Sequence, residues 1–93
     1  MNVRYYRRPW DESRGDAFDA WGRSVWYFEV AEDGYPLRQI EQYEDGHVLV
    51  YDAAHAEDEY GGLGDQPLDR HELAAFEITR DEFFAAWGAS SRG

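Results

Sequence analysis

Cysteine and lysine are both absent from the 93-residue sequence. Without cysteine the chain forms no disulfide, offers no thiolate nucleophile and builds no cysteine-ligated zinc site. Long apolar runs are missing too, so we expect no membrane span, and the basic start MNVRYYRRPW does not lead into the apolar run of a signal peptide. These absences together predict a cytoplasmic protein. All nine basic residues are arginine, which is typical of GC-rich coding sequence.

Positive charge is also scarce. Twenty Asp and Glu residues face nine arginines, which gives a net charge of −11, and residues 16–93 alone carry −13 because residues 1–15 are locally basic. Nucleic-acid phosphates and anionic membrane surfaces attract basic surfaces. We therefore expect no nucleic-acid binding by direct phosphate contact and no membrane binding, whereas a basic protein partner suits this charge.

What the chain does have is enough apolar material for one small core, with 43% hydrophobic and 17% aromatic residues. We predict a single α+β domain over residues 1–93, in which an antiparallel three- to four-stranded meander sheet carries a C-terminal helix on one face. Its predicted parts are an N-terminal segment (1–24), a β-meander (25–52), an acidic and glycine-rich loop (53–67) and a helical region (68–90). In the first part, the pattern leaves the structure open, with VRYY as a candidate edge strand and DAFDAW as a candidate helical turn.

Two Asp-Gly pairs, Asp33-Gly34 and Asp45-Gly46, predict two-residue hairpin loops of type I′ in the meander. These loops would set residue 29 opposite 38 and residue 43 opposite 48. One sheet face then carries Trp26, Phe28, Val30, Leu37, Tyr43, Val48 and Val50, with Gln39 and Glu41 as polar exceptions. The other face carries Val25, Tyr27, Glu29, Arg38, Ile40, Gln42, Leu49 and Tyr51.

Two capping boxes predict where helices begin. Thr79 with Glu82 begins the C-terminal helix, and Asp69 with Glu72 begins a short helical turn. Gly88 marks the predicted end of the C-terminal helix. We expect the apolar side of this helix (Phe83, Phe84, Trp87) to pack on the face of Trp26, Phe28 and Val30. The opposite face is then either covered by the N-terminal segment or a contact surface.

The sequence contains no catalytic motif. The serines stand in no G-x-S-x-G context, and the glycines at 61, 62 and 64 match no phosphate-binding pattern. Carboxylates and a histidine crowd the stretch after the meander, so metal-dependent hydrolysis at Asp52, His55 and Asp58 is one hypothesis. A charge run of this kind is typical of a solvated loop, however. We therefore expect no catalytic residue, no cofactor, no metal site and no enzymatic activity.

The aromatic excess points to binding. Aromatic residues outside the predicted core, together with arginines and the acidic cluster, form a candidate binding surface: Arg7, Arg8, Trp10, Trp21, Tyr27, Tyr51, Asp52, His55, Asp58 and Glu59. We predict a non-enzymatic acidic protein-interaction domain that docks on a basic protein partner. The alternative is a small-molecule or peptide-binding domain with an aromatic pocket between the N-terminal segment and the sheet, where arginine and indole groups would meet an anionic ligand. A homodimer is also open.

Several strings in the sequence carry a resemblance to a known family. They are RRPW, WG-x-S-x-WYFEV, DG-x-P-x-RQIE-x-Y-x-DG, EDEYGGLG and FEIT-x-(D/E)-EF-x-x-AW, which together run from Arg7 to Trp87. In these strings the chain resembles a family of small uncharacterised domains, a domain of unknown function, from high-GC bacteria. That resemblance implies no activity, cofactor or catalytic residue. In size, charge and α+β build the chain is also similar to immunity proteins of polymorphic toxin systems, which bind and block a toxin.

Overall fold

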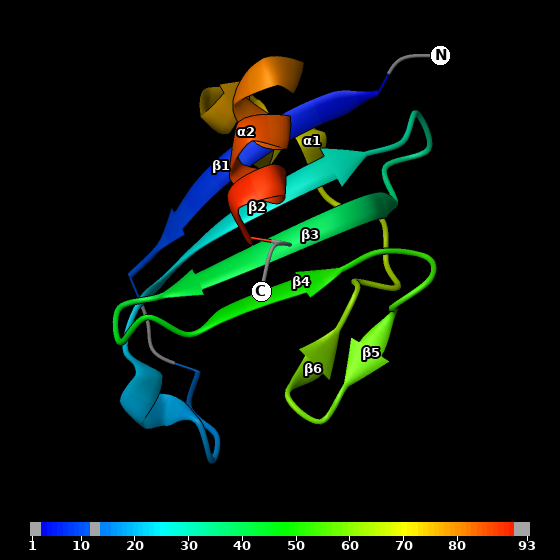
Figure 1. Cartoon of the computed structure of the whole chain (residues 1–93). Coiled ribbons are helices and arrows are strands. Elements are labelled where there is room, and N and C mark those ends of the chain that lie inside the picture. The colour runs from blue at the N-terminus through cyan, green and yellow to red at the C-terminus, as the bar shows by residue number, and fades with distance from the viewer. Residues whose placement is uncertain (1–2, 12–13, 91–93) are drawn as a thin grey trace.

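The computed structural model describes residues 3–11 and 14–90. Its main feature is an antiparallel five-stranded sheet with the strand order β4-β3-β2-β1-β7, which consists of β1 (Arg4–Trp10), β2 (Ser24–Val30), β3 (Pro36–Tyr43), β4 (Val48–Tyr51) and β7 (Glu77–Ile78). Helix α2 (Arg80–Ser90) lies across one face of this sheet (Figure 1). The predicted α+β fold, a meander sheet with a C-terminal helix on one face, is confirmed.

The N-terminal strand extends the meander on the side away from β4. β1 pairs along its whole length with β2, from Arg4 opposite Val30 to Trp10 opposite Ser24. Its outer side pairs with β7 over only two residues. The predicted strand at VRYY is therefore present, but it is longer than expected, and β7 rather than β1 lies last in the strand order.

The two Asp-Gly turns close longer loops than the sequence predicted. Gly34 and Gly46 have positive φ (+93° and +101°), whereas no described residue other than glycine has one. A type I′ turn needs positive φ at the aspartate as well. Each loop instead holds three residues, as the hydrogen bond from Tyr43 N–H to the His47 carbonyl (2.9 Å) shows for the second.

The first hairpin absorbs its additional loop residue. An irregularity between Glu29 and Val30 restores the register, so that β2 and β3 pair as predicted along most of their length. Glu29 lies opposite Arg38, and the two side chains form an ion pair. The predicted register of these two strands is therefore confirmed up to residue 29.

The second hairpin does not absorb its additional residue, and here the prediction is wrong. β4 is shifted by one position, so that Gln42 rather than residue 43 faces Val48. A one-residue shift turns every side chain to the other side of the sheet. Leu49 and Tyr51 therefore lie on the side where the sequence placed Val48 and Val50.

Helix α2 packs on the opposite side of the sheet from the one predicted. The buried cluster beneath it consists of Tyr5, Ile40 and Phe83, with Phe84 and Trp87 packed around them. We call this side of the sheet the helix face. The expected packing against Trp26, Phe28 and Val30 is wrong, because that side carries the polar Gln39 and Glu41, which a helix would leave without partners. The N-terminal segment does not cover the opposite face either, since β1 is part of the sheet.

Several short segments cover the other side of the sheet, which we call the groove face. At one end, α1 (Arg70–Leu73) and the 3-10 helix η2 (Ala74–Phe76) bring Leu73 into a cluster with Tyr6, Phe28 and Val30. At the other end, the 3-10 helix η1 (Asp19–Trp21), the predicted turn in DAFDAW, brings Trp21 into a cluster with Tyr43, Leu49 and Tyr51. A small hairpin of β5 (Glu57–Asp58) and β6 (Gly61–Gly62) lies within the predicted acidic and glycine-rich loop.

Both predicted helix starts are present. The Glu82 N–H donates to Thr79 Oγ1 (3.1 Å), and the Thr79 N–H donates to the Glu82 carboxylate (3.2 Å). The Asp69 carboxylate caps α1 by accepting two backbone N–H groups. Gly88 does not end α2, however, because the helix continues to Ser90 and Gly88 does not have the positive φ of a helix-ending glycine.

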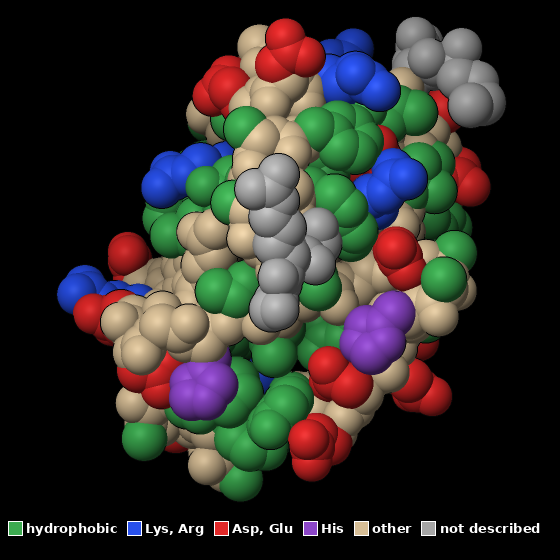
Figure 2. Space-filling view, in the orientation of Figure 1, with side chains coloured by type: hydrophobic (Ala, Val, Ile, Leu, Met, Phe, Trp, Pro, Cys, Tyr) green, Lys and Arg blue, Asp and Glu red, His purple; other side chains and the backbone are tan. Residues whose placement is uncertain are grey.

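The side that carries α2 has mixed surface chemistry. Figure 2 shows hydrophobic side chains beside the helix and acidic side chains mainly at the periphery, with several near the part of the fold where Figure 1 shows β5 and β6. No helix in the described part of the chain is long and apolar enough to cross a membrane.

Candidate functional site

The strand register aligns chemically different side chains in rows across the groove face. Arg8 pairs with Trp26, and Trp26 pairs with Glu41, so that a cation, an indole and a carboxylate follow one another across β1, β2 and β3. The next row consists of Trp10, Ser24 and Tyr43. Neighbouring strands lie about 4.8 Å apart, so each row spans about 10 Å from β1 to β3.

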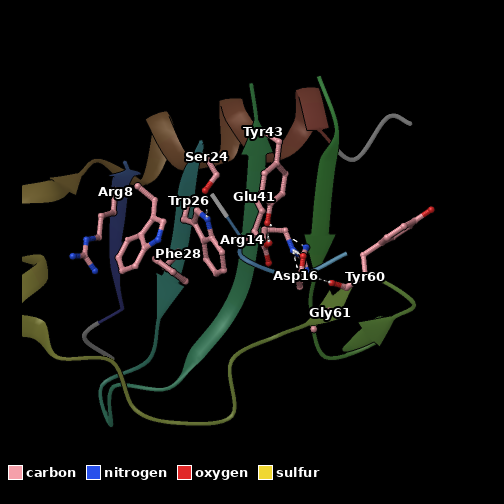
Figure 3. A pocket seen from close by; sticks show the side chains of 12 residues that line it. Arg8, Arg14, Asp16, Ser24, Trp26, Phe28, Glu41, Tyr43, Tyr60 and Gly61 are labelled. Atoms are coloured by element: carbon pink, nitrogen blue, oxygen red, sulfur yellow. Dashed lines mark hydrogen bonds and ion pairs between the residues drawn. The ribbon is translucent and has the colours of Figure 1, made fainter. Parts of the chain in front are cut away.

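A groove of about 550 Å³ lies over these rows. The sheet forms its floor, while Arg14 and Asp16 of the N-terminal segment and the turn at residues 60–62 form its wall. Figure 3 shows Trp26 and Phe28 between Arg8 at one end and Arg14 with Asp16 at the other. The lining residues are Arg8, Trp10, Arg14, Asp16, Ser24, Trp26, Phe28, Glu41, Tyr43, Tyr60, Gly61 and Gly62.

Two buried polar side chains, Glu41 (4% exposed) and Gln39 (2% exposed), organise the floor. Gln39 Nε2 donates to one carboxylate oxygen of Glu41 (2.7 Å), and the Tyr43 hydroxyl donates to the other (2.5 Å). Gln39 also donates to the Gly62 carbonyl (3.3 Å) and accepts from the Gly64 N–H (3.1 Å). The two polar exceptions of the sequence pattern therefore hold the glycine-rich segment against the sheet.

The buried setting changes how the groove floor titrates. Burial raises the pKa of Glu41, and the hydrogen bonds from Tyr43 and Gln39 offset this only in part. Burial and the hydrogen bond to Glu41 raise the pKa of Tyr43, so its hydroxyl stays protonated and donates at neutral pH. Each ionised carboxylate oxygen has two lone pairs, so Glu41 retains the capacity to accept a further hydrogen bond.

Arg14 fastens the wall of the groove. Its Nη2 donates to the Tyr60 carbonyl (2.5 Å), and its Nε forms an ion pair with Asp16 (3.0 Å). The guanidinium also lies over the rings of Phe18 and Trp21, 5.1 and 5.6 Å from their centroids. One largely buried cation thus joins the N-terminal segment, η1 and the β5–β6 hairpin.

Arg8 stands at the other end of the groove. Its guanidinium lies 4.4 Å from the ring centroid of Trp10 and 5.9 Å from that of Phe76. The neighbouring Arg7 points to the helix face, where its Nε donates to the Tyr27 hydroxyl (3.2 Å). Adjacent arginines of one strand therefore serve opposite faces of the sheet.

The structure separates the ten residues of the predicted binding surface. Arg8 and Trp10 line the groove, and Arg7 and Tyr27 lie on the helix face. Trp21 and Tyr51 are buried in the core. The remaining four follow β4 in the chain: Asp52, His55, Asp58 and Glu59.

The groove contains residues that sequence reasoning missed. The sequence pattern places Trp26 in the core and marks Glu41 only as a polar exception, and it gives no role to Arg14 or Tyr60. The available signal was the pair of polar residues on an otherwise apolar sheet face. The groove is not the pocket expected between the N-terminal segment and the sheet. Of the four aromatic residues in the predicted binding surface (Trp10, Trp21, Tyr27 and Tyr51), only Trp10 lines it, and the β5–β6 hairpin supplies part of its wall.

The acidic segment after β4 uses its carboxylates for local structure. Asp58 accepts hydrogen bonds from the Tyr51 hydroxyl (2.9 Å) and the Tyr60 N–H (2.8 Å). Burial acts to raise the pKa of Asp58, but these hydrogen bonds hold it below its usual value. Asp52 accepts from the backbone N–H of His55 (2.8 Å). Among the described residues, no group of three or more His, Asp and Glu side chains is placed to hold a metal ion, the set proposed for metal-dependent hydrolysis included.

Comparisons with protein-family models, with curated proteins and with solved structures found no match. The resemblance to a family of small domains from high-GC bacteria therefore stays a prediction.

Proposed function

We propose that this protein is a non-enzymatic binding domain that takes a small ligand in the groove of its sheet. The observation that carries the proposal is the groove itself, an open space of about 550 Å³ between an aromatic floor and a wall fastened by polar contacts. Small-molecule sites typically measure about 300–1,000 Å³ and combine apolar surface with a few placed polar groups. Trp26 and Phe28 supply the apolar surface, and Arg8 and Glu41 supply the polar groups.

The lining favours binding over catalysis. Among the described residues that line the groove there is no histidine, and the carboxylates of Glu41 and Asp16 already accept hydrogen bonds from other residues of this chain. The single lining serine, Ser24, is buried, and its Oγ accepts the indole N–H of Trp26 (2.7 Å). A cytoplasmic location, which the sequence favours, belongs to this proposal.

The four tryptophans provide a direct test. Trp10 and Trp26 line the groove, whereas Trp21 is buried beside it and Trp87 lies on the helix face. In a fragment screen followed by the indole N–H signals of the labelled protein, we expect ligands to shift Trp10 and Trp26 and to leave Trp87 unchanged. Trp26→Leu should abolish the response, and Trp87→Phe should preserve it. A full library that moves neither groove indole contradicts the proposal.

A basic protein partner is a second candidate, favoured by the acidic surface beside the groove wall. Glu57, Asp58 and Glu59 are exposed there, in a chain whose residues 16–93 carry −13. Such a surface attracts a basic partner and weakens with salt. A toxin blocked by an immunity-like protein is one partner of this kind.

Charge reversal tests the second candidate. A partner recovered from lysate at low salt should dissociate at high salt and should bind Glu57→Arg/Glu59→Arg at least about tenfold more weakly. The matched control is Asp81→Arg, an exposed acid in the first turn of α2. Equal binding by both variants would show that the β5–β6 hairpin is not the docking surface.

A further inference from the structure

Arg8 is an arginine of the groove without a carboxylate partner among the residues that the structure describes. Four arginines in the described part of the chain form ion pairs: Arg4 with Glu77, Arg14 with Asp16, Arg23 with Glu44 and Arg38 with Glu29. Arg7, Arg8 and Arg80 form none there, and of these three only Arg8 lines the groove. Arg8 contacts aromatic rings and forms no ion pair within residues 3–11 and 14–90. In a chain with 20 acids and 9 arginines, a guanidinium without a carboxylate at the end of a groove is available to an anion from outside.

The next residue in the row, Trp26, offers an apolar face. Its indole N–H is already donated to Ser24 (2.7 Å), so the indole has no polar group left for a ligand. Phe28 lies beside it, with 5.9 Å between the ring centroids. A flat aromatic body suits these two rings because offset and tilted ring contacts are favourable.

The third residue in the row of Arg8, Trp26 and Glu41 can accept a hydrogen bond from a ligand. Its two carboxylate oxygens each accept one hydrogen bond, from Gln39 and from Tyr43, and the residue lines the groove. The backbones of Arg8 and Glu41 lie two strand spacings, or about 10 Å, apart, which gives the scale of a ligand that reaches from one residue to the other. The net charge of −11 also repels polyanions, which favours a single negative charge on the ligand.

We propose that the groove binds a small aromatic monocarboxylate with a hydrogen-bond donor at its far end. The carboxylate pairs with Arg8, the ring packs on Trp26 and Phe28, and the donor points to Glu41. This inference rests on the proposed function and gives the ligand its chemical class.

Three matched compounds test the class. 3-(4-Hydroxyphenyl)propionate carries both end groups, 3-phenylpropionate lacks the donor, and 4-ethylphenol lacks the carboxylate. We expect the first to bind most tightly in titrations of the Trp10 and Trp26 indole signals. Loss of a hydrogen bond to a charged group typically weakens binding about tenfold or more, so each truncated compound should lose about that factor.

Neighbouring arginines supply the protein variants. Arg8→Gln should weaken both carboxylates about tenfold and leave 4-ethylphenol unchanged. Arg7→Gln alters the preceding residue on the helix face and should change none of the three affinities. Equal binding of the acid and the phenol, or equal losses in the two variants, overturns the proposal. If the two carboxylates bind equally, the proposed hydrogen bond from the ligand to Glu41 is wrong. This comparison tests the role of Glu41 without a substitution at that buried residue.

The same titrations distinguish a wrong ligand class from a wrong binding function. If none of the three compounds shifts Trp10 or Trp26 while another compound of the library does, the ligand class is wrong and the binding function stands. If no compound shifts either indole, both are wrong. In either case the helix-face Trp87 reports whether the protein has remained folded.

Discussion

The two faces of the sheet are covered in different ways, and the candidate site lies on the face that several short segments cover. A single continuous helix, α2, covers the helix face and buries Tyr5, Ile40 and Phe83 beneath it. Several short segments cover the two ends of the groove face and leave its middle open. The helix closes the part of its face around Tyr5, Ile40 and Phe83, whereas Pro9, Val25 and Gln42 on the same side of the sheet help to line a separate cavity of about 380 Å³. The short segments on the groove face are held by polar contacts and leave space between them.

The buried glutamates of the two faces reflect this contrast. On the helix face, Glu29 has the guanidinium of Arg38 opposite it. On the groove face, Glu41 is held by two neutral donors, Gln39 and Tyr43. Glu29 is in direct contact with a guanidinium, whereas Glu41 forms no ion pair among the described residues, although the charge of Arg14 acts on it and offsets part of the rise in pKa that burial causes. The second arrangement is the one that a ligand can complete.

The largest expected effect is a loss of stability on substitution of a buried residue of the helix face, compared with a partly buried residue of the groove face. Phe83 is completely buried, so Phe83→Ala should lower the free energy of unfolding by about 3–5 kcal/mol. Trp26→Ala on the groove face should cost less than about 2 kcal/mol, because the indole is only partly buried. Urea unfolding checks both values, and Phe83→Leu provides a milder variant if the alanine form does not fold. Equal costs at the two positions would contradict the view that the groove face is the more open one.

Much of this comparison was predictable from local sequence patterns. The β2–β3 register, the facing of Glu29 and Arg38 and both helix starts follow from alternation and capping boxes. These features depend on residues close in sequence, where the spacing of a few side chains determines the geometry. The fold class was predictable for the same reason.

Loop lengths and contacts between segments far apart in the sequence could not be predicted. An Asp-Gly pair is compatible with a two-residue loop and with a three-residue loop that ends in a glycine of positive φ. The loop at Gly46 has three residues, which shifts the register of β4 by one residue and places Leu49 and Tyr51 on the groove face. The groove also depends on Arg14 reaching Tyr60, a contact between segments 46 residues apart that no periodicity records.

The next prediction concerns the polar ties of the groove cover. Arg14 is largely buried and bonds the Tyr60 carbonyl, so Arg14→Ala should cost about 1–3 kcal/mol. Arg23 forms an exposed ion pair with Glu44, and Arg23→Ala should change stability by less than about 1 kcal/mol. Hydrogen exchange should show faster exchange of the Leu63 amide, which is bonded to the Ala56 carbonyl (2.7 Å), in the Arg14 variant alone. An equally protected Leu63 amide would mean that the hairpin is held without Arg14.

The smallest expected effect is a change of the free energy of unfolding with pH. Its slope reports how far water is excluded from Glu41 at the groove floor. The pKa of Glu41 is raised above its ordinary value of 4.5, chiefly by burial. The native state therefore holds this proton more tightly than the unfolded state, and the associated stability is complete below the ordinary pKa and is lost as the pH rises through the native pKa. We expect the free energy of unfolding of the native sequence, relative to Glu41→Gln, to fall as the pH rises from about 4 to about 7.

The control for this slope lies three residues further along the chain. The hydrogen bond from the Arg23 side chain lowers the pKa of Glu44, which is exposed. The stability that Glu44 contributes is therefore present above its ordinary pKa and is lost as the pH falls through the native pKa, so the difference from Glu44→Gln should rise with pH. Opposite slopes for the two glutamates, measured by urea unfolding in matched buffers, would sharpen the contrast between the groove floor and its surroundings. A flat difference for Glu41 would mean that water reaches the carboxylate freely, and the floor would then lack the dry setting that makes a buried charge select its ligand.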